Sequence, residues 1–521
     1  MFLQLPALLT LLCSSLSFGG KVLVFPMDGS HWLQMKVLVE ELHSKGHELT
    51  VLCPGDSWFI KDSPLYQTIS IPSISSDEKK MTNFAAKMTQ MRTEELSLQD
   101  YWNMMFEVFD YQYEKHKIVN DAVREMFDNE TLMDQLKGAK FDLMLTDPVV
   151  GAGVLMAHRL GLPLVLVARW TFVGDGHSLI APSPLSYVPT PMTDTDKMTF
   201  IQRVQNVLKY CFLSAQFSIN IEPSYQSVVR DYFGPDVNYK ELLQSADIWL
   251  MRIDFVFEFP RPTMPNVIYI AGYPCKPAKP LPRHLEDFMQ SSSEHGVVVM
   301  SLGTLVAQLP DYVVEEIAAA FAKLPQKVVW RYKGKRPENL GNNTLLLEWL
   351  PQSDLLGHPN TKAFVAHGGT NGIQEAIYHG VPLVGLPLMY DQRENFARMT
   401  VRGAAKVLDI ATLNRDIFLQ ALEEVLYDAS YRENMQALSH VHRDTPLKPL
   451  DTAVFWVEFV MRHKGAKHLR TESYQLSLVQ YYSVDVLLFL MAVFLLCGII
   501  VLTVMKLLWG LICHRRKLKK Q

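Results

Sequence analysis

Short apolar runs alternate with helical stretches along this chain of 521 residues, and they do so in two blocks. Runs such as 21–26 and 49–52 are too short for buried helices and indicate buried strands, with a helical stretch at 32–45 between them. The second block repeats this order from residue 297 to residue 386. Such alternation is typical of parallel sheets covered by helices, so the chain is predicted to be an α/β protein with two doubly wound domains.

The composition excludes several classes of protein. Hydrophobic residues make up 48% of the chain and charged residues 20%, which excludes a disordered or low-complexity protein. The formal net charge of −4 gives no sign of nucleic-acid binding, so no nucleic-acid partner is expected. Cys53, Cys211 and Cys275 are widely spaced and include no Cys-x-x-Cys pair, so neither a disulfide framework nor a metal site is predicted.

Both ends of the chain carry apolar segments that indicate targeting to a membrane. Residues 1–20 hold an apolar run followed by small residues, as in a secretory signal peptide, although the usual basic start is absent. Residues 486–505 contain Thr503 as their one polar side chain and are long enough to span a bilayer as a single transmembrane helix. The basic tail 506–521 is predicted to be cytosolic, which makes the chain a type I membrane protein with a lumenal body.

The tail also resembles a dibasic retrieval signal, which predicts residence in the endoplasmic reticulum membrane. Asn129 and Asn342 each begin an acceptor sequence for N-glycosylation there. The remaining predicted divisions are an N-terminal domain (21–255), a Pro-rich linker (256–285), a second domain (286–448) and a segment before the membrane (449–480). The helix of this last segment is expected to pack back on the first domain.

The segment 363–392 has the strongest chemical signature. A predicted strand ends at His367 and two glycines, the second of them Gly369, and a helix opens beside Asn371. Glycines let backbone N–H groups approach an anion, and a helix N-terminus adds about half a positive charge, so a diphosphate fits this turn. Glu375 lies one helical turn further on and could accept hydrogen bonds from a ribose.

Asp391 and Gln392 follow the next predicted strand, and this carboxylate–amide pair suits the hydroxyl groups of a sugar. Together with the turn, the pair resembles the signature of the UDP-glycosyltransferases, and in particular of the membrane-bound animal UDP-glucuronosyltransferases. The resemblance extends over nearly the whole chain, including the segments 257–262, 301–304, 349–352 and 455–467.

The resemblance implies a GT-B fold, in which two Rossmann-like doubly wound domains face a cleft, followed by a C-terminal transmembrane helix. Trp349 and Gln352 would hold the uracil, and Asp391 and Gln392 would hold the sugar. The diphosphate and the ribose would be bound by residues of the second domain: Ser301, Thr304, His367, Gly369, Asn371 and Glu375. The family uses a UDP-sugar as co-substrate, here expected to be UDP-glucuronate, and needs no other cofactor.

In the first domain, His31 follows the first predicted strand and Asp147 ends another. Taken alone, a His beside Trp32 is more often structural, and an Asp before Pro148 more often caps a helix. Both match the family's positions for the catalytic base and its partner. A neutral imidazole can take the proton of an attacking hydroxyl, and a carboxylate can orient the ring. The expected reaction is inverting, metal-independent transfer that gives a β-glycoside and UDP.

The acceptor is expected to be a small lipophilic molecule, bound in the first domain near Trp32 and residues 81–127. Arg169 and Arg393 are candidates to hold the carboxylate of glucuronate. Met389 and Tyr390 stand where the family more often has Phe and a small residue, so UDP-glucose, UDP-galactose or UDP-N-acetylglucosamine stays open as the donor. Homo- or hetero-oligomers are a family expectation that the sequence does not test.

Three alternatives belong to other classes of protein. Asp194-Thr195-Asp196 has the spacing of a metal-dependent glycosyltransferase, but it lies in a polar stretch that indicates a solvated loop. Gly151 and Gly153 begin a dinucleotide-binding pattern whose third glycine is replaced, so close helix–sheet packing explains them better. A catalytically silent membrane protein that binds UDP-sugar is the third alternative, and intact His31 and Asp147 argue against it.

Overall fold

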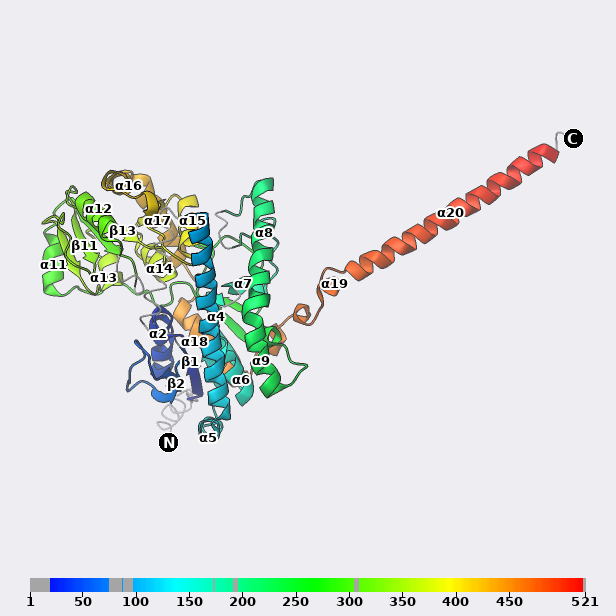
Figure 1. The fold of residues 1–521 in the computed structure, drawn as a ribbon, viewed down its shortest axis with the longest axis horizontal. Coiled ribbons are helices and arrows are strands. Elements are labelled where there is room, and N and C mark those ends of the chain that lie inside the picture. The colour runs from blue at the N-terminus through cyan, green and yellow to red at the C-terminus, as the bar shows by residue number, and fades with distance from the viewer. Residues whose placement is uncertain are drawn as a thin grey trace, which may run out of the picture. The chain divides into compact units, whose positions relative to one another are not determined.

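The structure is a computed structural model of the chain, and it describes residues 19–74, 87, 97–171, 174–190, 195–303 and 309–518. It divides into two compact units, Met1–Leu469 and Arg470–Gln521. The first unit contains two parallel sheets with their helices, and the second contains one long apolar helix (Figure 1). The predicted signal peptide falls almost entirely outside the described residues.

The first sheet has seven described strands in the spatial order β3-β2-β1-β4-β5-β8-β9, and every neighbouring pair is parallel. The central strands β4 and β5 are buried at every position. Parallel sheets are covered on both faces, which is why their strands read as continuous apolar runs in the sequence. The strands are β1 (Lys21–Phe25), β2 (Glu48–Pro54), β3 (Gln67–Ile71), β4 (Leu143–Thr146), β5 (Leu164–Ala168), β8 (Ile248–Met251) and β9 (Val267–Tyr269).

The helices of this half lie between its strands. A short antiparallel ribbon of β6 (Trp170–Thr171) and β7 (Gly174–Asp175) follows β5. The helices are α2 (Ser30–Ser44), α4 (Leu98–Asp128), α5 (Glu130–Gly138), α6 (Ala152–Leu160), α7 (Gly176–Ile180), α8 (Phe200–Gln216), α9 (Glu222–Phe233) and α10 (Tyr239–Gln244), with a π-helical turn η1 (Phe217–Ile221) between α8 and α9.

The second sheet has six described strands in the order β12-β11-β10-β13-β14-β15, again all parallel. These strands are β10 (Val297–Ser301), β11 (Lys327–Arg331), β12 (Thr344–Leu347), β13 (Thr361–Ala366), β14 (Leu383–Gly385) and β15 (Ala405–Val407). The helices around them are α11 (Arg283–Gln290), α12 (Asp311–Phe321), α13 (Gln352–Leu356), α14 (Thr370–His379), α15 (Gln392–Val401), α16 (Arg415–Tyr427) and α17 (Ala429–Arg443), with a 3-10 turn η2 (Ile410–Thr412).

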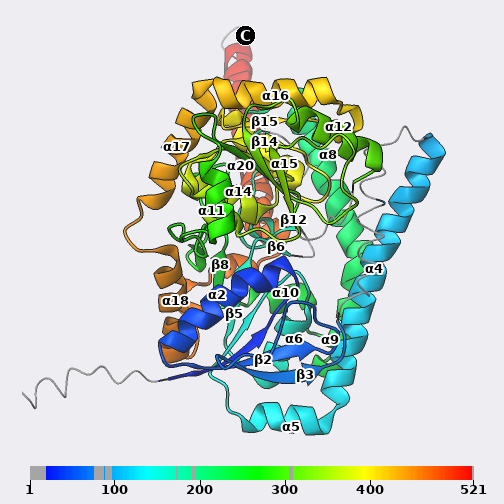
Figure 2. The same ribbon diagram turned by 90° about the vertical axis from the view of Figure 1, so that its left-hand side faces the viewer.

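After the second sheet is complete, the chain returns to the first. Helix α18 (Pro449–His463) contributes Val457 and Met461 to the same core as Val22 and Leu143 of the first sheet. It packs beside α2 (Figure 2). A proline at the first turn of α18 suits its start, because a helix leaves that N–H without a partner in any case.

Some element boundaries differ from those that the sequence predicts. Helix α2 begins two residues before the expected start at residue 32, whereas α14 begins at Thr370, next to the Asn371 beside which a helix is expected. Strand β9 lies inside the predicted linker 256–285, where it pairs with β8 as the edge of the first sheet. Strand β9 has too few residues to show an apolar pattern in the sequence. It is recognised as a strand only through its pairing with β8 in the structure. The domain boundaries themselves stay a prediction.

The second unit contains α20 (Val484–Leu518), of which Val484–Ile512 is long and apolar enough to cross a membrane. The predicted span 486–505 lies inside it. The helix continues past Lys506 because nothing in its sequence breaks a helix before the basic end. The short helices α19 (Leu478–Tyr481), η3 (Lys467–Leu469) and η4 (Glu472–Tyr474) precede it along the chain.

Candidate active site

Both sheets reverse their strand order at the corresponding place. The reversal lies between β1 and β4 in the first sheet, and between β10 and β13 in the second. Open α/β sheets bind ligands beyond the carboxyl ends of their strands at such switch points. The residues that follow these four strands are therefore the first candidates for a site, and they include most of the residues that the sequence indicates.

His31 and Asp147 meet at the switch point of the first sheet. Asp147 directly follows β4, and its Oδ2 lies 2.7 Å from Nδ1 of His31 on the first turn of α2. The carboxylate is 2% exposed and the imidazole 26% exposed, so the pair is buried on one side and reachable on the other. The N–H of Val149 donates to the second carboxylate oxygen at 3.0 Å, which fixes its orientation.

The turn before His31 is held by a second carboxylate. Gly29 has a φ of +82°, a conformation that glycine adopts without strain. This conformation lets α2 begin at the next residue, Ser30. Asp28 accepts hydrogen bonds from the backbone N–H groups of Gly29 and Trp58 and from the hydroxyl of Ser57. The position of His31 is therefore set by a structured turn.

The charge of Asp147 is stabilised inside the protein. Burial raises the pKa of this carboxyl, but the nearby charges of His31 and Arg252 and the hydrogen bonds it accepts lower the pKa further, to below its ordinary value. Arg252 follows β8, the sixth strand of the first sheet. An ionised carboxylate can only accept, so His31 must donate from Nδ1 when the imidazole is neutral.

The glycine pair near Asp147 serves packing. A Cβ on Gly153 would lie 2.0 Å from Oγ1 of Thr146, whose hydroxyl donates to the carbonyl of Phe25 at 2.7 Å. A Cβ on Gly151 would lie 2.3 Å from the ring of Tyr225. Gly153 therefore lets α6 approach β4 closely, and Gly151 lets the chain before α6 approach α9, which agrees with the packing interpretation of the sequence.

Trp32 does not lie where the sequence suggests. The side chain is fully buried and contacts Tyr66 edge-on in the core of the first sheet, with ring centres 5.6 Å apart. The prediction that it lines an acceptor pocket is therefore wrong, because an apolar position one residue after His31 on α2 points into the core. Most of the predicted acceptor stretch before residue 97 lies outside the described residues.

At the second switch point, two glycines enclose His367. A Cβ on Gly303, after β10, would lie 2.6 Å from Nε2 of His367, and a Cβ on Gly369 would lie 2.5 Å from the same atom. Burial lowers the pKa of His367 to about 4, so the imidazole is neutral near pH 7 and can still donate one N–H. Ser301, the last residue of β10, is buried beside this turn.

Helix α14 begins at Thr370 directly after the turn, and Gly369 gives its N-terminus no side-chain cap. Its first N–H groups are therefore available to an anion, and the helix dipole favours negative charge there. Asn371 lies in this first turn. Thr304, which the family resemblance places beside the diphosphate, lies outside the described residues, as does Asp194 of the alternative metal motif.

Two residues that are predicted to bind the uracil and the ribose come together, one at the start of α13 and the other on α14. Gln352 donates from Nε2 to Oε2 of Glu375 at 2.6 Å. Burial raises the pKa of Glu375 to about 7, although the bond from Gln352 lowers it in part. Trp349 is 57% exposed, and the guanidinium carbon of Arg331 lies 5.3 Å from its ring centre. Arg331 also donates to the carbonyl of Gly303, which links the aromatic face to the glycine turn around His367.

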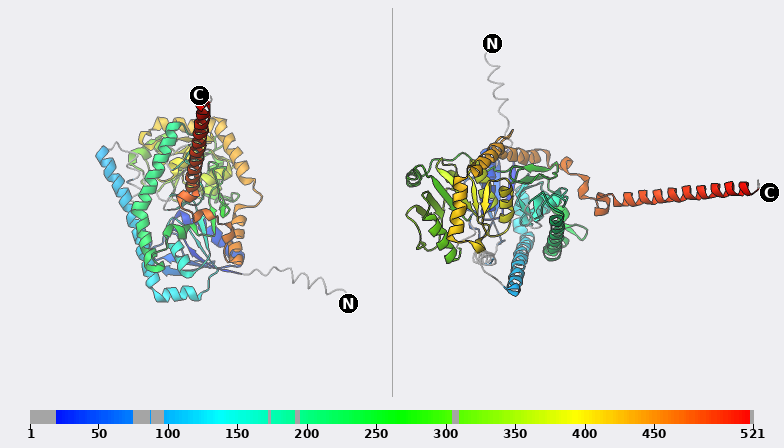
Figure 3. Two further views of the ribbon diagram at one scale, coloured as in Figure 1. Left: turned by 90° about the vertical axis from the view of Figure 1, so that its right-hand side faces the viewer. Right: turned by 90° about the horizontal axis from the view of Figure 1, so that it is seen from above.

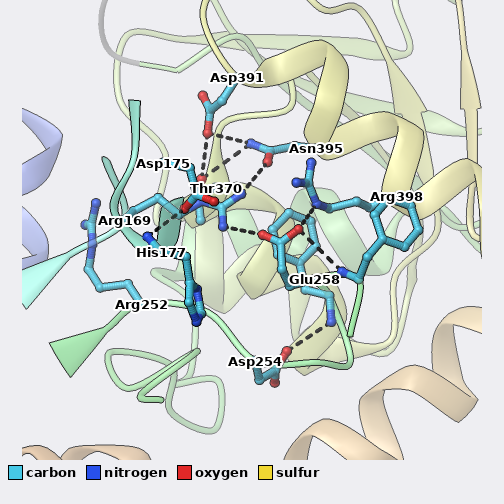
Figure 4. A network of polar contacts seen from close by, with 12 residues as sticks. Arg169, Asp175, His177, Arg252, Asp254, Glu258, Thr370, Asp391, Asn395 and Arg398 are labelled. Atoms are coloured by element: carbon cyan, nitrogen blue, oxygen red, sulfur yellow. Dashed lines mark hydrogen bonds and ion pairs between the residues drawn. The ribbon is translucent and has the colours of Figure 1, made fainter. Parts of the chain in front are cut away.

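Asp391 is held by three donors, of which one comes from the first half of the chain, and Figure 4 shows the other two, Thr370 and Asn395. Its Oδ2 accepts from Nε1 of Trp170 at 3.0 Å, from the hydroxyl of Thr370 at 3.0 Å and from Nδ2 of Asn395 at 2.9 Å. Its Oδ1 takes part in none of these bonds. Gln392 instead accepts from the backbone N–H groups of residues 388 and 389 and closes its own turn.

Arg169 belongs to a buried charge network rather than to an open pocket. It is 2% exposed, pairs with Glu258 at 2.5 Å, and donates to Oδ1 of Asn395 at 3.2 Å. Arg398 also binds Glu258 (Figure 4). Arg169 is therefore committed to Glu258 and does not fit the role of a partner for a substrate carboxylate, whereas Arg393 is exposed on α15.

Several residues of this site were not predicted. The fold brings four such residues into contact with predicted ones. Asp391 is contacted by Trp170, Thr370 and Asn395, and Trp349 is contacted by Arg331. Two of them had a signal in the sequence: Thr370 stands between Gly369 and Asn371, and Asn395 lies four residues after Asp391 and thus on the same helical face. Among the described residues, no group of three or more His, Cys, Asp and Glu side chains could hold a metal ion.

A family model described as UDP-glucoronosyl and UDP-glucosyl transferase matches residues 20–520. The chain belongs to this family. Mouse UDP-glucuronosyltransferase 2A2 is 44% identical to it over 483 residues, which cover 91% of this chain and 90% of the mouse protein. Human UDP-glucuronosyltransferase 2A3 is 44% identical over 496 residues, covering 93% and 92% of the two chains. The family resemblance predicted from the sequence is thereby confirmed.

Solved structures show the same fold. The glycotransferase of kitacinnamycin matches with a TM-score of 0.57 at 19% identity, over 85% of this chain and 98% of its own. A UDP-glucosyltransferase from Polygonum tinctorium matches with a TM-score of 0.57 at 16% identity, over 85% and 99%. The predicted GT-B fold is confirmed. The chain is a glycosyltransferase that moves a glycosyl group from a UDP-sugar to an acceptor, and its C-terminal helix fits a single-pass membrane anchor.

Proposed function

We propose that this UDP-glycosyltransferase transfers glucuronic acid from UDP-glucuronate to a hydroxyl group of a small lipophilic acceptor, with inversion at the anomeric carbon. His31 is the general base and Asp147 is its partner. The observation that supports this most strongly is the 2.7 Å contact between two side chains that lie 116 residues apart in the sequence and meet at a sheet's switch point.

The two residues divide the work of deprotonation. Asp147 accepts the N–H at Nδ1 of His31, which leaves Nε2 with the lone pair. An acceptor hydroxyl bound to Nε2 gives up its proton while its oxygen attacks the sugar's anomeric carbon from the side opposite UDP. The bond to UDP breaks, and the α-linked donor becomes a β-glycoside. The ionised carboxylate of Asp147 stabilises the imidazolium that forms.

The second sheet supplies the groups that stabilise the leaving diphosphate. The open N-terminus of α14, the neutral ring of His367 and the buried hydroxyl of Ser301 surround the turn at Gly369. Fixed N–H and O–H donors aimed at developing charge supply the stabilisation, so the proposal requires no metal ion. Glu375 binds the ribose hydroxyls, Asn371 faces the diphosphate, and Trp349 with Gln352 binds the uracil.

The sugar is bound by Asp391 through Oδ1, the oxygen that its three protein donors leave unused. Glucuronate is proposed because the relatives that match almost the whole chain are named UDP-glucuronosyltransferases. Arg393 is the remaining candidate for its carboxylate. The basic tail supports a place in the endoplasmic reticulum membrane, with both sheets in the lumen.

The test is a donor panel. Microsomes that contain the full-length protein are given a phenolic acceptor and UDP-glucuronate, UDP-glucose, UDP-galactose or UDP-N-acetylglucosamine, and the anomeric configuration of each product is read by proton NMR. We expect a β-glucuronide and a weaker preference for glucuronate in Arg393→Ala. Absence of any glycoside would contradict the transferase mechanism. An α-linked product would contradict inversion, and a preference for a neutral sugar would contradict the proposed donor.

A further inference from the structure

Helix α4 carries a lysine that has no part in the proposed mechanism. Lys115 is partly buried, and it forms no hydrogen bond or ion pair with another described residue. Burial lowers the pKa of its ammonium group, and the nearby carboxylate of Asp147 raises the pKa only in part. Asp147 is itself bound to His31. Among the described residues, the lysine therefore lies beside the His31–Asp147 pair without an anion of its own.

The contacts of His116 fix α4 next to the loop that follows β4. The imidazole is 4% exposed, and its Nδ1 lies 2.9 Å from the hydroxyl oxygen of Tyr225 on α9. The same oxygen accepts from the N–H of Gly151, four residues after Asp147, at 3.1 Å. Figure 3 shows α4 as the long light-blue helix along the side of the first unit, where it packs on α9. The residue next to Lys115 is thus tied to the segment that carries Asp147.

The same face of α4 also reaches the loop before Asp391. Tyr111 lies one turn before Lys115, and residues four apart share a face of a helix. Burial raises the pKa of Tyr390, which directly precedes Asp391, and the nearby Tyr111 raises it further. One turn of α4 thus has Asp147 near its second residue and Tyr390 near its first. This face of the helix borders both halves of the proposed site.

Charge determines which acceptors suit this place. An acceptor bound there meets the ionised carboxylate of Asp147 on one side and the diphosphate of the donor on the other. An acceptor that is itself an anion is repelled by both, unless a cation compensates its charge. An ammonium group without a protein partner supplies that compensation through a charge-assisted hydrogen bond. A neutral acceptor instead leaves the partly desolvated ammonium unpaired, which is unfavourable.

We propose that Lys115 binds the negatively charged group of the acceptor, so that the preferred acceptors are hydroxyl compounds that also carry a carboxylate. The inference rests on the proposed function and names the acceptor class of the same site. The ammonium group donates to the carboxylate, and the acceptor's hydroxyl binds Nε2 of His31 and is glycosylated there. Lys115 takes no proton in the transfer and acts on specificity alone. It lies within the stretch 81–127 that the sequence predicts to bind the acceptor.

The test compares two acceptors that differ in charge but little in shape, para-hydroxyphenylpropanoate and para-hydroxyphenylpropanamide. Full-length wild type, Lys115→Met and Lys115→Arg are assayed in microsomes with the preferred donor of the panel above, and the phenolic glycoside is measured by mass spectrometry. Lys117→Met is the matched control, because Lys117 is exposed on the same helix. Binding of radiolabelled propanoate to the detergent-solubilised protein is measured by equilibrium dialysis, which requires no transfer.

In Lys115→Met we expect kcat/KM for the propanoate to fall by about 10- to 100-fold, as for a lost hydrogen bond between charged groups, while kcat/KM for the amide changes by less than about twofold. Lys115→Arg keeps most of the preference for the propanoate because it keeps the charge, and Lys117→Met behaves like the wild type. Equal losses with both acceptors would overturn the proposal and assign Lys115 to the fold or to the His31–Asp147 pair. An unchanged preference for the propanoate in Lys115→Met, or a wild type that prefers the amide, would overturn it as well.

The dialysis separates a failure of this inference from a failure of the proposed function. A wild type that forms no glycoside with either acceptor would contradict the proposed function, and the binding data then decide the role of Lys115. Weaker binding of the propanoate in Lys115→Met than in Lys117→Met supports the proposal. Equal binding in the two variants would overturn it.

Discussion

At the scale of single residues, burial determines which side chains around the second sheet carry charge. Burial lowers the pKa of His367 to about 4, which keeps the ring neutral beside the diphosphate turn. It raises the pKa of Glu375 to about 7, so this carboxyl changes its charge in the range where such an enzyme is assayed. Asp147 differs from both, because His31 and Arg252 compensate its burial and keep it ionised.

Glu375→Gln is expected to raise the thermal unfolding midpoint at pH 8 and to leave it nearly unchanged at pH 5. A carboxyl whose pKa is raised in the folded state stabilises the fold below its unfolded value, and it loses that contribution as pH rises through about 7. Above this pH the buried carboxylate costs up to about 3 kcal/mol, which the neutral amide removes. The measurement is thermal unfolding of the ligand-free protein at both pH values. Equal shifts at pH 5 and pH 8 would contradict the assignment.

Single residues also show how far a sequence can predict a site. His31 and His367 both follow short apolar runs in the βαβ order, but that place alone favours a structural role for His31, so its role as base was predicted from the family resemblance. Trp170 and Arg331 could not be predicted, because each reaches its partner through packing between distant segments. Arg169 was one of two candidates for the carboxylate of glucuronate, because its partner Glu258 lies 89 residues away and only the fold brings the two together.

At the scale of elements, the turn between β13 and α14 matters more than either element alone. Gly303 and Gly369 come from loops after different strands and leave room for one imidazole between them. The start of α14 then lies beside this ring with its first N–H groups exposed to a ligand. The two loops therefore form one surface, and this is the surface proposed to bind the diphosphate.

Gly369→Ala is expected to weaken binding of UDP by about 5- to 150-fold, because the added methyl group displaces His367 and overpacking costs about 1–3 kcal/mol. Gly138→Ala is the matched control, since a Cβ there meets nothing within 4 Å. The dissociation constant of UDP is measured by calorimetry on the detergent-solubilised protein. An unchanged dissociation constant in Gly369→Ala would show that the enclosed imidazole is not part of the UDP site.

Elements with strong periodicity were predicted within a few residues, as α2, β10 and α14 show. Helix α4, with 31 residues, was not assigned as one helix, and β9 was hidden in the Pro-rich linker. Both are stabilised by tertiary contacts: α4 packs on α9, and β9 pairs with β8. Local sequence carries little information on such partners.

At the scale of the whole molecule, buried polar groups join the two halves of the first unit. Glu258 follows β8 and binds both Arg169 of the first half and Arg398 on α15. Gln374 on α14 binds the backbone at Arg252 and Gly272. The network includes Asn395, which also binds Asp391, so the carboxylate proposed to bind the sugar depends on how the halves meet.

Glu258→Gln is expected to destabilise the protein by about 3–5 kcal/mol, because it leaves two buried guanidinium groups without their carboxylate. Burial raises the pKa of Glu258, but Arg398 and Arg169 lower it far more, so the group is ionised in the native protein. Glu424→Gln, which breaks a partly exposed pair with Lys406, serves as control and is expected to cost about 1 kcal/mol or less. Both are measured by chemical denaturation. Equal losses in the two variants would contradict the importance of the network.

The central claim, that His31 is the base of a UDP-sugar transfer, is tested most directly by His31→Ala in the full-length protein. Transfer to a phenolic acceptor and binding of UDP are measured side by side in the same microsomes. The imidazole lies at the switch point of the first sheet and the proposed UDP site at that of the second, so we expect kcat to fall by about 10²–10⁴-fold while the affinity for UDP stays unchanged. Wild-type kcat in His31→Ala with intact UDP binding would contradict the account.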